Sequence, residues 1–107
     1  MNIYGLMKMG LDATELRGRV IANNITNINT PGYKRKYVTF EDTLKGKMDN
    51  AKIEVKTDEG SIMREDKNNV DLENEKVNQA ATTLQYNALV SLTNTKIAMT
   101  KSVISGR

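Results

Sequence analysis

The sequence predicts a mainly α-helical protein with two long terminal helices joined by a short irregular or hairpin-like centre. Apolar residues recur at alternating steps of three and four at both ends of the chain, as they do along one face of a helix. Pro31, the only proline among 107 residues, closes the first periodic stretch, and a polar stretch without that period follows it. We therefore divide the chain into residues 1–30, a centre at 31–70 and residues 71–107, with the two ends forming one domain.

The first segment contains a seam typical of a coiled coil. Its positions are Leu6, Met9, Ala13, Leu16, Val20, Asn23 and Asn27. A second apolar flank beside it contains Met7, Leu11, Ile21, Ile25 and Ile28. Because a residue before proline is disfavoured in helical geometry, we expect this helix to end near Asn29.

The centre is too polar to bury a core of its own. Residues 37–40 and 52–57 have the composition of short extended pieces, and residues 58–61 that of a turn. Residues 62 and 63 follow that turn and are expected to pair back across it. A hairpin of this size is marginal in water, so we expect the centre to be ordered only where it docks.

The second helix is predicted to begin at Asp71. Aspartate is a favoured N-cap, and Glu73 and Glu75 place negative charge in the first turn, where the helix dipole favours it. Residues 77–95 carry no charge of either sign. One stripe of this helix comprises Val77, Ala81, Leu84, Ala88, Ser91, Thr95 and Ala98. A second stripe comprises Tyr86, Leu89, Val90, Thr93, Ile97 and Ile104.

Two helices of this kind cannot cover each other completely. A helix that is apolar on several sides must be covered on several sides, and one partner helix of similar length covers only one. We therefore predict that other copies of the chain, or related chains, supply the missing cover in an assembly. The side chains expected to pack between subunits are Leu16, Val20, Ile25, Val77, Leu84, Tyr86, Leu89 and Ile97.

The composition argues against several other functions. The chain has neither cysteine nor histidine, which removes disulfides, thiolate chemistry and the commonest general base and metal ligand. No nucleophile–base pair, phosphate loop or carboxylate dyad is visible, so we expect no enzyme activity and no cofactor. A net charge of +3 is a weak footprint for a nucleic-acid binder. No segment is apolar enough to span a bilayer, and the N-terminus lacks the features of a cleaved secretory signal.

An asparagine-rich run ends the first helix. It is unfavourable helix material, because asparagine side chains compete for nearby backbone groups. The run, residues 22–36, reads Ala-Asn-Asn-Ile-Thr-Asn-Ile-Asn-Thr-Pro-Gly-Tyr-Lys-Arg-Lys. It resembles the segment near the N-terminus of bacterial flagellar rod, hook and hook-associated proteins, with Thr26 in place of the usual alanine. The motif residues are Asn23, Asn24, Asn27, Asn29, Thr30, Pro31, Gly32 and Tyr33.

The second helix carries a matching resemblance. Residues 69–75, 84–90 and 95–104, which include the sequences Asn-Val-Asp and Leu-Gln-Tyr-Asn-Ala-Leu-Val, resemble the C-terminal segment of proximal flagellar rod proteins. The resemblance implies antiparallel pairing of the terminal helices around a narrow channel in the basal-body rod. It also implies export by the flagellar type III apparatus without a cleaved signal peptide, and helical polymerisation with related rod proteins.

Phe40 and Leu44 lie four residues apart, so both fall on one face of a helical turn and could dock together into a small apolar groove. After the rod motif, this pattern resembles the signal read by the flagellar type III export gate. The alternative interpretation is that both side chains anchor the loop onto the terminal helices.

Two other functions stay open at this point. One is a small helical adaptor that forms a discrete cytoplasmic oligomer. The other, less favoured, is a nucleic-acid-binding hairpin that uses the basic and aromatic residues 33–37. A calcium loop at residues 66–77 is rejected, because the required turn glycine and closing glutamate are missing.

Overall fold

The structure is a computed structural model that describes residues 2–41, 51–60 and 64–106. Within these residues lie two α-helices, α1 (Ile3–Thr26) and α3 (Leu72–Ser105), and two short strands, β1 (Lys36–Thr39) and β2 (Glu54–Thr57). The molecule is elongated, with principal extents of 64 × 26 × 14 Å. The predicted fold class, two long helices joined by a hairpin-like centre, is confirmed.

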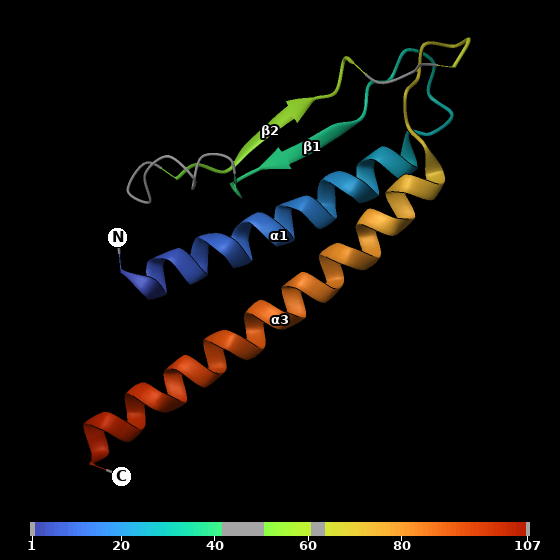
Figure 1. The fold of residues 1–107 in the computed structure, drawn as a ribbon. Helices are drawn as coiled ribbons and strands as arrows, with labels where there is room; N and C mark the ends of the chain where they lie inside the picture. Colours follow the sequence, from blue (N-terminus) through green and yellow to red (C-terminus); the bar gives the residue numbers. More distant parts are fainter. Residues whose placement is uncertain (1, 42–50, 61–63, 107) are drawn as a thin grey trace.

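The helices lie side by side and run in opposite directions, with α1 between α3 and the two-stranded sheet (Figure 1). The antiparallel pairing that the resemblance implied is therefore present within one chain. The contacts that define its register join Tyr4 to Thr100, Gly10 to Leu89, Arg17 to Gln85 and Asn24 to Glu75.

Helix α1 ends at Thr26, three residues before the predicted end near Asn29. The side chain of Thr26 donates to the Ala22 carbonyl at 2.8 Å, and that of Asn27 donates to the Asn23 carbonyl at 2.9 Å. Such local bonds compete with the helical ladder, which explains the earlier end. Residues 27–30 continue as tight turns, with the Thr30 amide donating to the Asn27 carbonyl at 3.0 Å.

Helix α3 begins as predicted. The Asp71 side chain accepts from the amides of Glu73 and Asn74, which completes an N-cap, and both Glu73 and Glu75 lie in the first turn. The helix ends at Ser105, and Gly106 follows in the left-handed conformation at φ 74°. Glycine is the usual residue at this position because it has no Cβ to clash.

The strands pair antiparallel, with Lys36 opposite Thr57 and Thr39 opposite Glu54. Both fall within or beside the predicted extended pieces, but β2 takes β1 as its partner. Residues 62 and 63, expected to pair with the same segment, lie outside the described residues. The sheet docks on α1, which supplies the support that so small a hairpin requires.

The buried stripe of α1 is rotated relative to the predicted seam. The buried residues of the helix are Gly10, Ala13, Thr14, Ile21 and Asn24. Of the predicted seam positions only Ala13 is buried, whereas Leu16 and Val20 are half-buried. The seam prediction was wrong because it followed apolar size. The two helices instead approach through small side chains, and an added Cβ at Gly10 would lie 3.6 Å from Leu89 Cδ1.

Candidate functional site: a buried polar cluster and an exposed helix face

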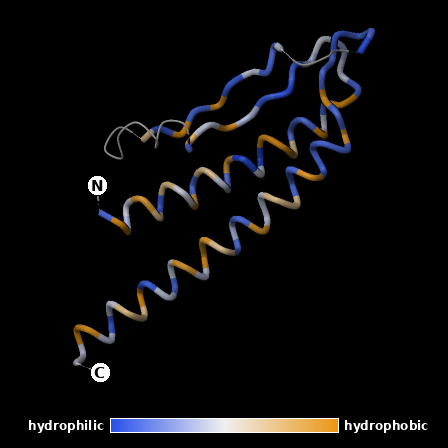
Figure 2. Tube along the Cα trace, in the orientation of Figure 1, coloured by the Kyte–Doolittle hydropathy of each residue, from blue (hydrophilic) through white to orange (hydrophobic). Residues whose placement is uncertain are grey.

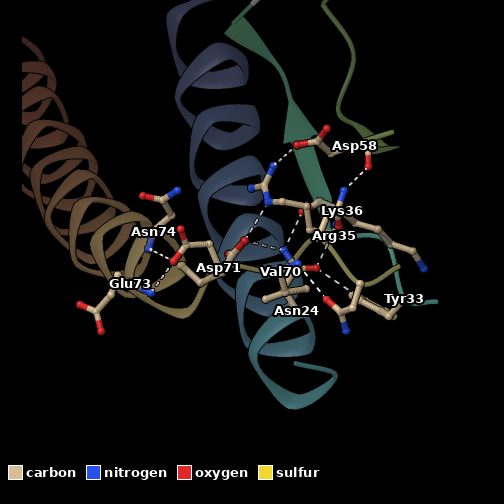
Figure 3. Close-up of polar contacts among 12 residues, drawn as sticks. Asn24, Tyr33, Arg35, Lys36, Asp58, Val70, Asp71, Glu73 and Asn74 are labelled. Carbon is tan, nitrogen blue, oxygen red and sulfur yellow. Dashed lines mark hydrogen bonds and ion pairs between the residues drawn. The ribbon is translucent and has the colours of Figure 1, made fainter. Parts of the chain in front are cut away.

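Polar side chains meet where the end of α1, the start of β1 and the start of α3 come together (Figure 3). Asn24, Asn68 and Glu75 are the largest fully buried side chains of the described residues. We call the group the polar cluster, and it comprises Asn24, Tyr33, Arg35, Asp58, Asn68, Asn69 and Glu75. Fully buried polar groups are stable only when they are hydrogen-bonded, so their partners explain how the cluster holds together.

Asn24 joins α1 to the strand and to α3. Its Oδ1 accepts from the Lys36 amide at 2.9 Å and from the Tyr33 hydroxyl at 3.0 Å. Its Nδ2 donates to the Lys36 carbonyl at 2.8 Å and to Glu75 Oε1 at 3.3 Å. One asparagine therefore pairs with both backbone groups of Lys36, as a neighbouring strand would.

Glu75 and Arg35 form the ionic part of the cluster. Arg35 Nε donates to Glu75 Oε1 at 2.8 Å, and its Nη1 donates to Asp58 Oδ2 at 3.1 Å. Burial by itself would lower the pKa of Arg35, but its hydrogen bonds to Glu75 and Asp58 raise that pKa above its ordinary value. Burial, together with the charge of Glu75, raises the pKa of the Tyr33 hydroxyl. Arginine and tyrosine therefore keep their protons, and both can donate to acceptors in the cluster.

The tandem asparagines before α3 complete the connection. Asn68 Nδ2 donates to the carbonyls of Asn27 and Thr30, both at 2.8 Å, and so satisfies acceptors just beyond the end of α1. Asn69 Oδ1 accepts from the Arg35 amide at 2.6 Å, and its Nδ2 donates to the Asp58 carbonyl at 2.6 Å. These bonds tie the entry of α3 to the exit of α1.

The remaining motif residues shape the turn rather than fill the cluster. Asn23 is exposed, and Asn27 donates to its side chain at 3.1 Å. Gly32 adopts φ 77°, a conformation that side chains rarely take, and its amide donates to the Asp66 carbonyl at 2.7 Å. The other motif residues, Asn29, Thr30 and Pro31, are exposed.

The second feature is the side of α3 that points away from α1. Glu75, Thr82 and Leu89 face α1. Because successive residues turn by about 100°, the residues three to four positions apart beginning at Val77 lie on the opposite side. We call this side the outer face of α3, and it comprises Val77, Ala81, Leu84, Ala88, Ser91, Leu92, Thr95 and Met99, all of them exposed. Figure 2 shows hydrophobic residues recurring along the whole length of the helix.

The residues predicted to pack between subunits divide into two groups. Val77, Leu84, Tyr86 and Ile97 are exposed, at 66%, 72%, 39% and 40% of their possible surface. The others, Leu16, Val20, Ile25 and Leu89, are half-buried within the chain. Leu89 packs over Gly10, so the second stripe of α3 is at least partly used by α1.

Phe40 follows directly after β1 and is 6% exposed, whereas Leu44 lies outside the described residues. In the folded chain Phe40 is therefore buried, as a loop anchor would be. The basic and aromatic run 33–37 is also engaged internally. Tyr33 and Arg35 belong to the polar cluster, and Arg35 lies over the ring of Tyr37 at 5.9 Å from its centroid.

Sequence reasoning missed most of the polar cluster. It identified Asn24 and Tyr33 as motif residues and Asn69 as the start of the Asn-Val-Asp match. It saw Glu75 only as a helix-start charge, Arg35 only as part of the basic and aromatic run 33–37, and Asp58 only as a turn residue, and it gave no functional role to Asn68. The usable signal was the pair Asn68–Asn69, one residue away from the N-cap Asp71, since adjacent asparagines outside a helix favour side-chain bonding to the backbone.

Comparison with known proteins locates the family. The family model for flagella basal body rod proteins matches residues 10–34, which span most of α1, the motif turn and Tyr33. The flagellar basal body rod protein FlgB of Bacillus subtilis is 29% identical over 119 residues, covering 94% of this chain and 91% of the relative. FlgB of Borrelia hermsii is 31% identical over 122 residues, covering 86% of this chain and 90% of the relative. The chain belongs to the FlgB family of flagellar basal body rod proteins.

A second rod protein shares only part of this FlgB-family chain. FlgG of Buchnera aphidicola subsp. Baizongia pistaciae is 49% identical over 39 residues, which are 36% of this chain and 15% of the relative. The resemblance that the sequence suggested is thus confirmed. Within the described residues of the FlgB-family chain, neither helix is long and apolar enough to cross a membrane.

Proposed function

We propose that this member of the FlgB family, a structural protein of the flagellar basal-body rod, polymerises helically through the outer face of α3. Its partners are other copies of itself and related rod proteins. We further propose that the chain reaches the rod unfolded, through the flagellar type III apparatus. The observation that carries the proposal is the number of large apolar side chains that α3 exposes to solvent.

Eight of the twelve exposed large apolar side chains among the described residues lie on α3. They are Val77, Leu84, Tyr86, Leu92, Ile97, Met99, Val103 and Ile104. Full burial of one such side chain contributes about 1.5–3 kcal/mol, so covering several of them in an assembly would supply a large driving force. In an isolated monomer these apolar side chains stay in water and contribute little to stability, whereas an assembly can bury them.

The outer face is also chemically suited to packing against helices. Residues 77–95 carry no charge, so a neighbouring helix meets no ion that must be desolvated. Large side chains such as Leu84 alternate with small ones such as Ala81 and Ala88, as in interlocking helix surfaces. The threonine, serine and asparagine side chains between them can hydrogen-bond across the contact.

For export, Phe40 and Leu44 remain the residues that we propose the gate recognises. Their four-residue spacing suits a shallow apolar groove once the segment is released from the fold. The test compares secreted with retained protein for Phe40→Ala, Leu44→Ala and Thr43→Ala at matched expression. Both apolar variants should be retained and Thr43→Ala should be secreted. Parent-like secretion of Phe40→Ala would leave these residues with an anchoring role alone.

The assembly proposal is tested by placing a charge on the outer face. Leu84→Glu should abolish rods and motility while the variant is still secreted, because an unpaired charge would be buried between subunits. Asn94→Glu, which is also exposed but lies off the outer face, is the matched control and should retain motility. Normal motility with Leu84→Glu would refute burial of this face in the rod.

Sedimentation at rising concentration separates the rod subunit from the adaptor that the sequence also allowed. A polymerising subunit should pass from monomer to open aggregates of no fixed size. A single closed oligomer that persists over the whole range would favour the adaptor.

A further inference from the structure

One guanidinium holds the chain on both sides of Phe40. Arg17, from the middle of α1, donates through Nη2 to the Val38 carbonyl at 3.2 Å and to Glu41 Oε2 at 2.8 Å. Its Nη1 donates to Glu41 Oε1 at 3.1 Å and to Gln85 of α3 at 3.2 Å. The contact with Glu41 is therefore bidentate, the geometry in which arginine–carboxylate pairs are strongest.

The Arg17 contacts lie on both sides of Phe40 in the sequence. Val38 lies two residues before Phe40, and Glu41 follows directly after it. Val38 and Glu41 are both bonded to Arg17 of α1, and the Phe40 side chain between them is 6% exposed. A side chain buried in this way cannot at the same time occupy a groove on another protein.

We propose that Arg17 and Glu41 act as a catch that hides Phe40 from the export gate whenever the chain is folded. This inference rests on the proposed recognition of Phe40 by the gate. An unfolded chain presents the segment freely, whereas a folded or assembled subunit withholds it. The gate would then bind unfolded chains and not folded subunits of the same sequence.

The Arg17–Glu41 contact can open without unfolding of the rest of the chain. The Arg17 side chain is 19% exposed and that of Glu41 is 51% exposed, so water screens the pair and the contact is not a deeply buried one. Its effect comes from position, because releasing Glu41 frees the chain end of β1 directly beside Phe40. Local opening of this kind requires no melting of the polar cluster at the other end of β1.

The first test measures access to Phe40. It is the only phenylalanine in the chain, so chymotryptic cleavage after it is identified unambiguously by mass spectrometry. Arg17→Gln should raise the cleavage rate at Phe40 by about tenfold, because proteolysis follows the population of the opened state. Arg19→Gln is the control, since Arg19 makes an exposed pair with Glu15 on the same helix and should leave the rate unchanged.

A charge exchange keeps the test decisive if loss of Arg17 harms folding in general. Glu41→Arg alone should accelerate cleavage, and the double variant Arg17→Glu with Glu41→Arg should restore slow cleavage. If the double variant is cleaved as fast as Glu41→Arg alone, the proposed catch is wrong. It is also wrong if the folded parent protein is cleaved at Phe40 as fast as the parent protein in urea.

The second test separates the catch from gate recognition itself. The purified cytoplasmic domain of the export gate is offered the full chain, either folded or freshly diluted from urea, with and without Phe40→Ala. The catch predicts that the diluted parent binds at least tenfold more tightly than the folded parent, and that folded Arg17→Gln recovers most of the difference. If the diluted parent and its Phe40→Ala variant bind equally, gate recognition of Phe40 fails. If Phe40 matters but folded and diluted parent bind alike, only the catch fails.

Discussion

The two ends of α3 differ in which side chains are buried and which are exposed. At its start, Glu75 is fully buried and bonded to Arg35 and Asn24. Toward its end, Val103 and Ile104 are 82% and 81% exposed. Polar residues are thus buried where the chain folds on itself, and apolar residues are exposed where it has no further chain to fold against. We propose that the start of α3 belongs to the subunit's own fold, whereas the outer face and the last residues of the helix are covered in the assembly.

The lengths of the helices explain why the contrast arises. Helix α1 has 24 residues and α3 has 34, so α1 cannot cover α3 to its end. Tyr4, near the start of α1, contacts Thr100. The exposed apolar residues Val103 and Ile104 lie beyond this contact, and we propose that a neighbouring subunit covers them.

Removing a central contact of the polar cluster should have the largest effect on stability. Asn24→Ala leaves the Lys36 backbone groups and the Tyr33 hydroxyl without their partner, at a cost of about 2–3 kcal/mol. Asn29→Ala, in the same asparagine run but exposed, should change stability by less than about 0.5 kcal/mol. Urea titration of both variants followed by circular dichroism measures the difference. Equal losses of stability in the two variants would show that the buried hydrogen bonds of Asn24 do not stabilise the fold.

Breaking the buried ion pair should produce a comparable loss. Glu75→Ala removes one partner of a buried ion pair, but Arg35 keeps Asp58 as its remaining carboxylate, so we expect a loss of about 2 kcal/mol. The Glu73→Ala variant is the control, because Glu73 lies in the same helical turn but is exposed. The same urea titration should separate the two, and a parent-like midpoint for Glu75→Ala would contradict the importance of the pair.

Charges on the two sides of α3 should act on different properties. Leu84→Glu, on the outer face, should leave the helical content of the monomer unchanged while preventing assembly. Leu89→Glu, which would meet Gly10, should lower the helical content of the monomer as well. Circular dichroism and sedimentation of each variant test this division. Identical behaviour of the two variants would show that α1 does not cover one side of α3 preferentially.

The smallest expected effect is a pH dependence at the middle of the helix pair. The hydrogen bond from Arg17 lowers the pKa of Glu41, so the contact contributes stability above the ordinary glutamate value of 4.5. That contribution is lost as the pH falls through the lowered pKa of the folded state. An NMR titration should show Glu41 titrating below 4.5 in the parent and closer to 4.5 in Arg17→Gln. An unchanged Glu41 titration in the variant would exclude Arg17 as the cause.

The sequence predicted the helices more reliably than the contacts between them. Periodicity, Pro31 and the Asp71 cap located both helices, because these signals act within a few residues along the chain. The buried side of α1 was missed because small residues such as Gly10 allow a close helix approach that apolar size does not indicate. The polar cluster was missed for a related reason. Arg35, Asp58 and Glu75 are far apart in the sequence, and only the fold brings these opposite charges together.

Amide hydrogen exchange on the monomeric chain, before and after polymerisation, tests the central contrast most directly. In the monomer, amides around the polar cluster, at residues 20–26, 33–36 and 72–82, should exchange markedly more slowly than those at residues 90–104. After polymerisation, residues 90–104 should become protected to a similar degree, because neighbouring subunits then cover them. Strong protection of residues 90–104 in a proven monomer, unchanged by polymerisation, would contradict the assignment of this part of α3 to the assembly.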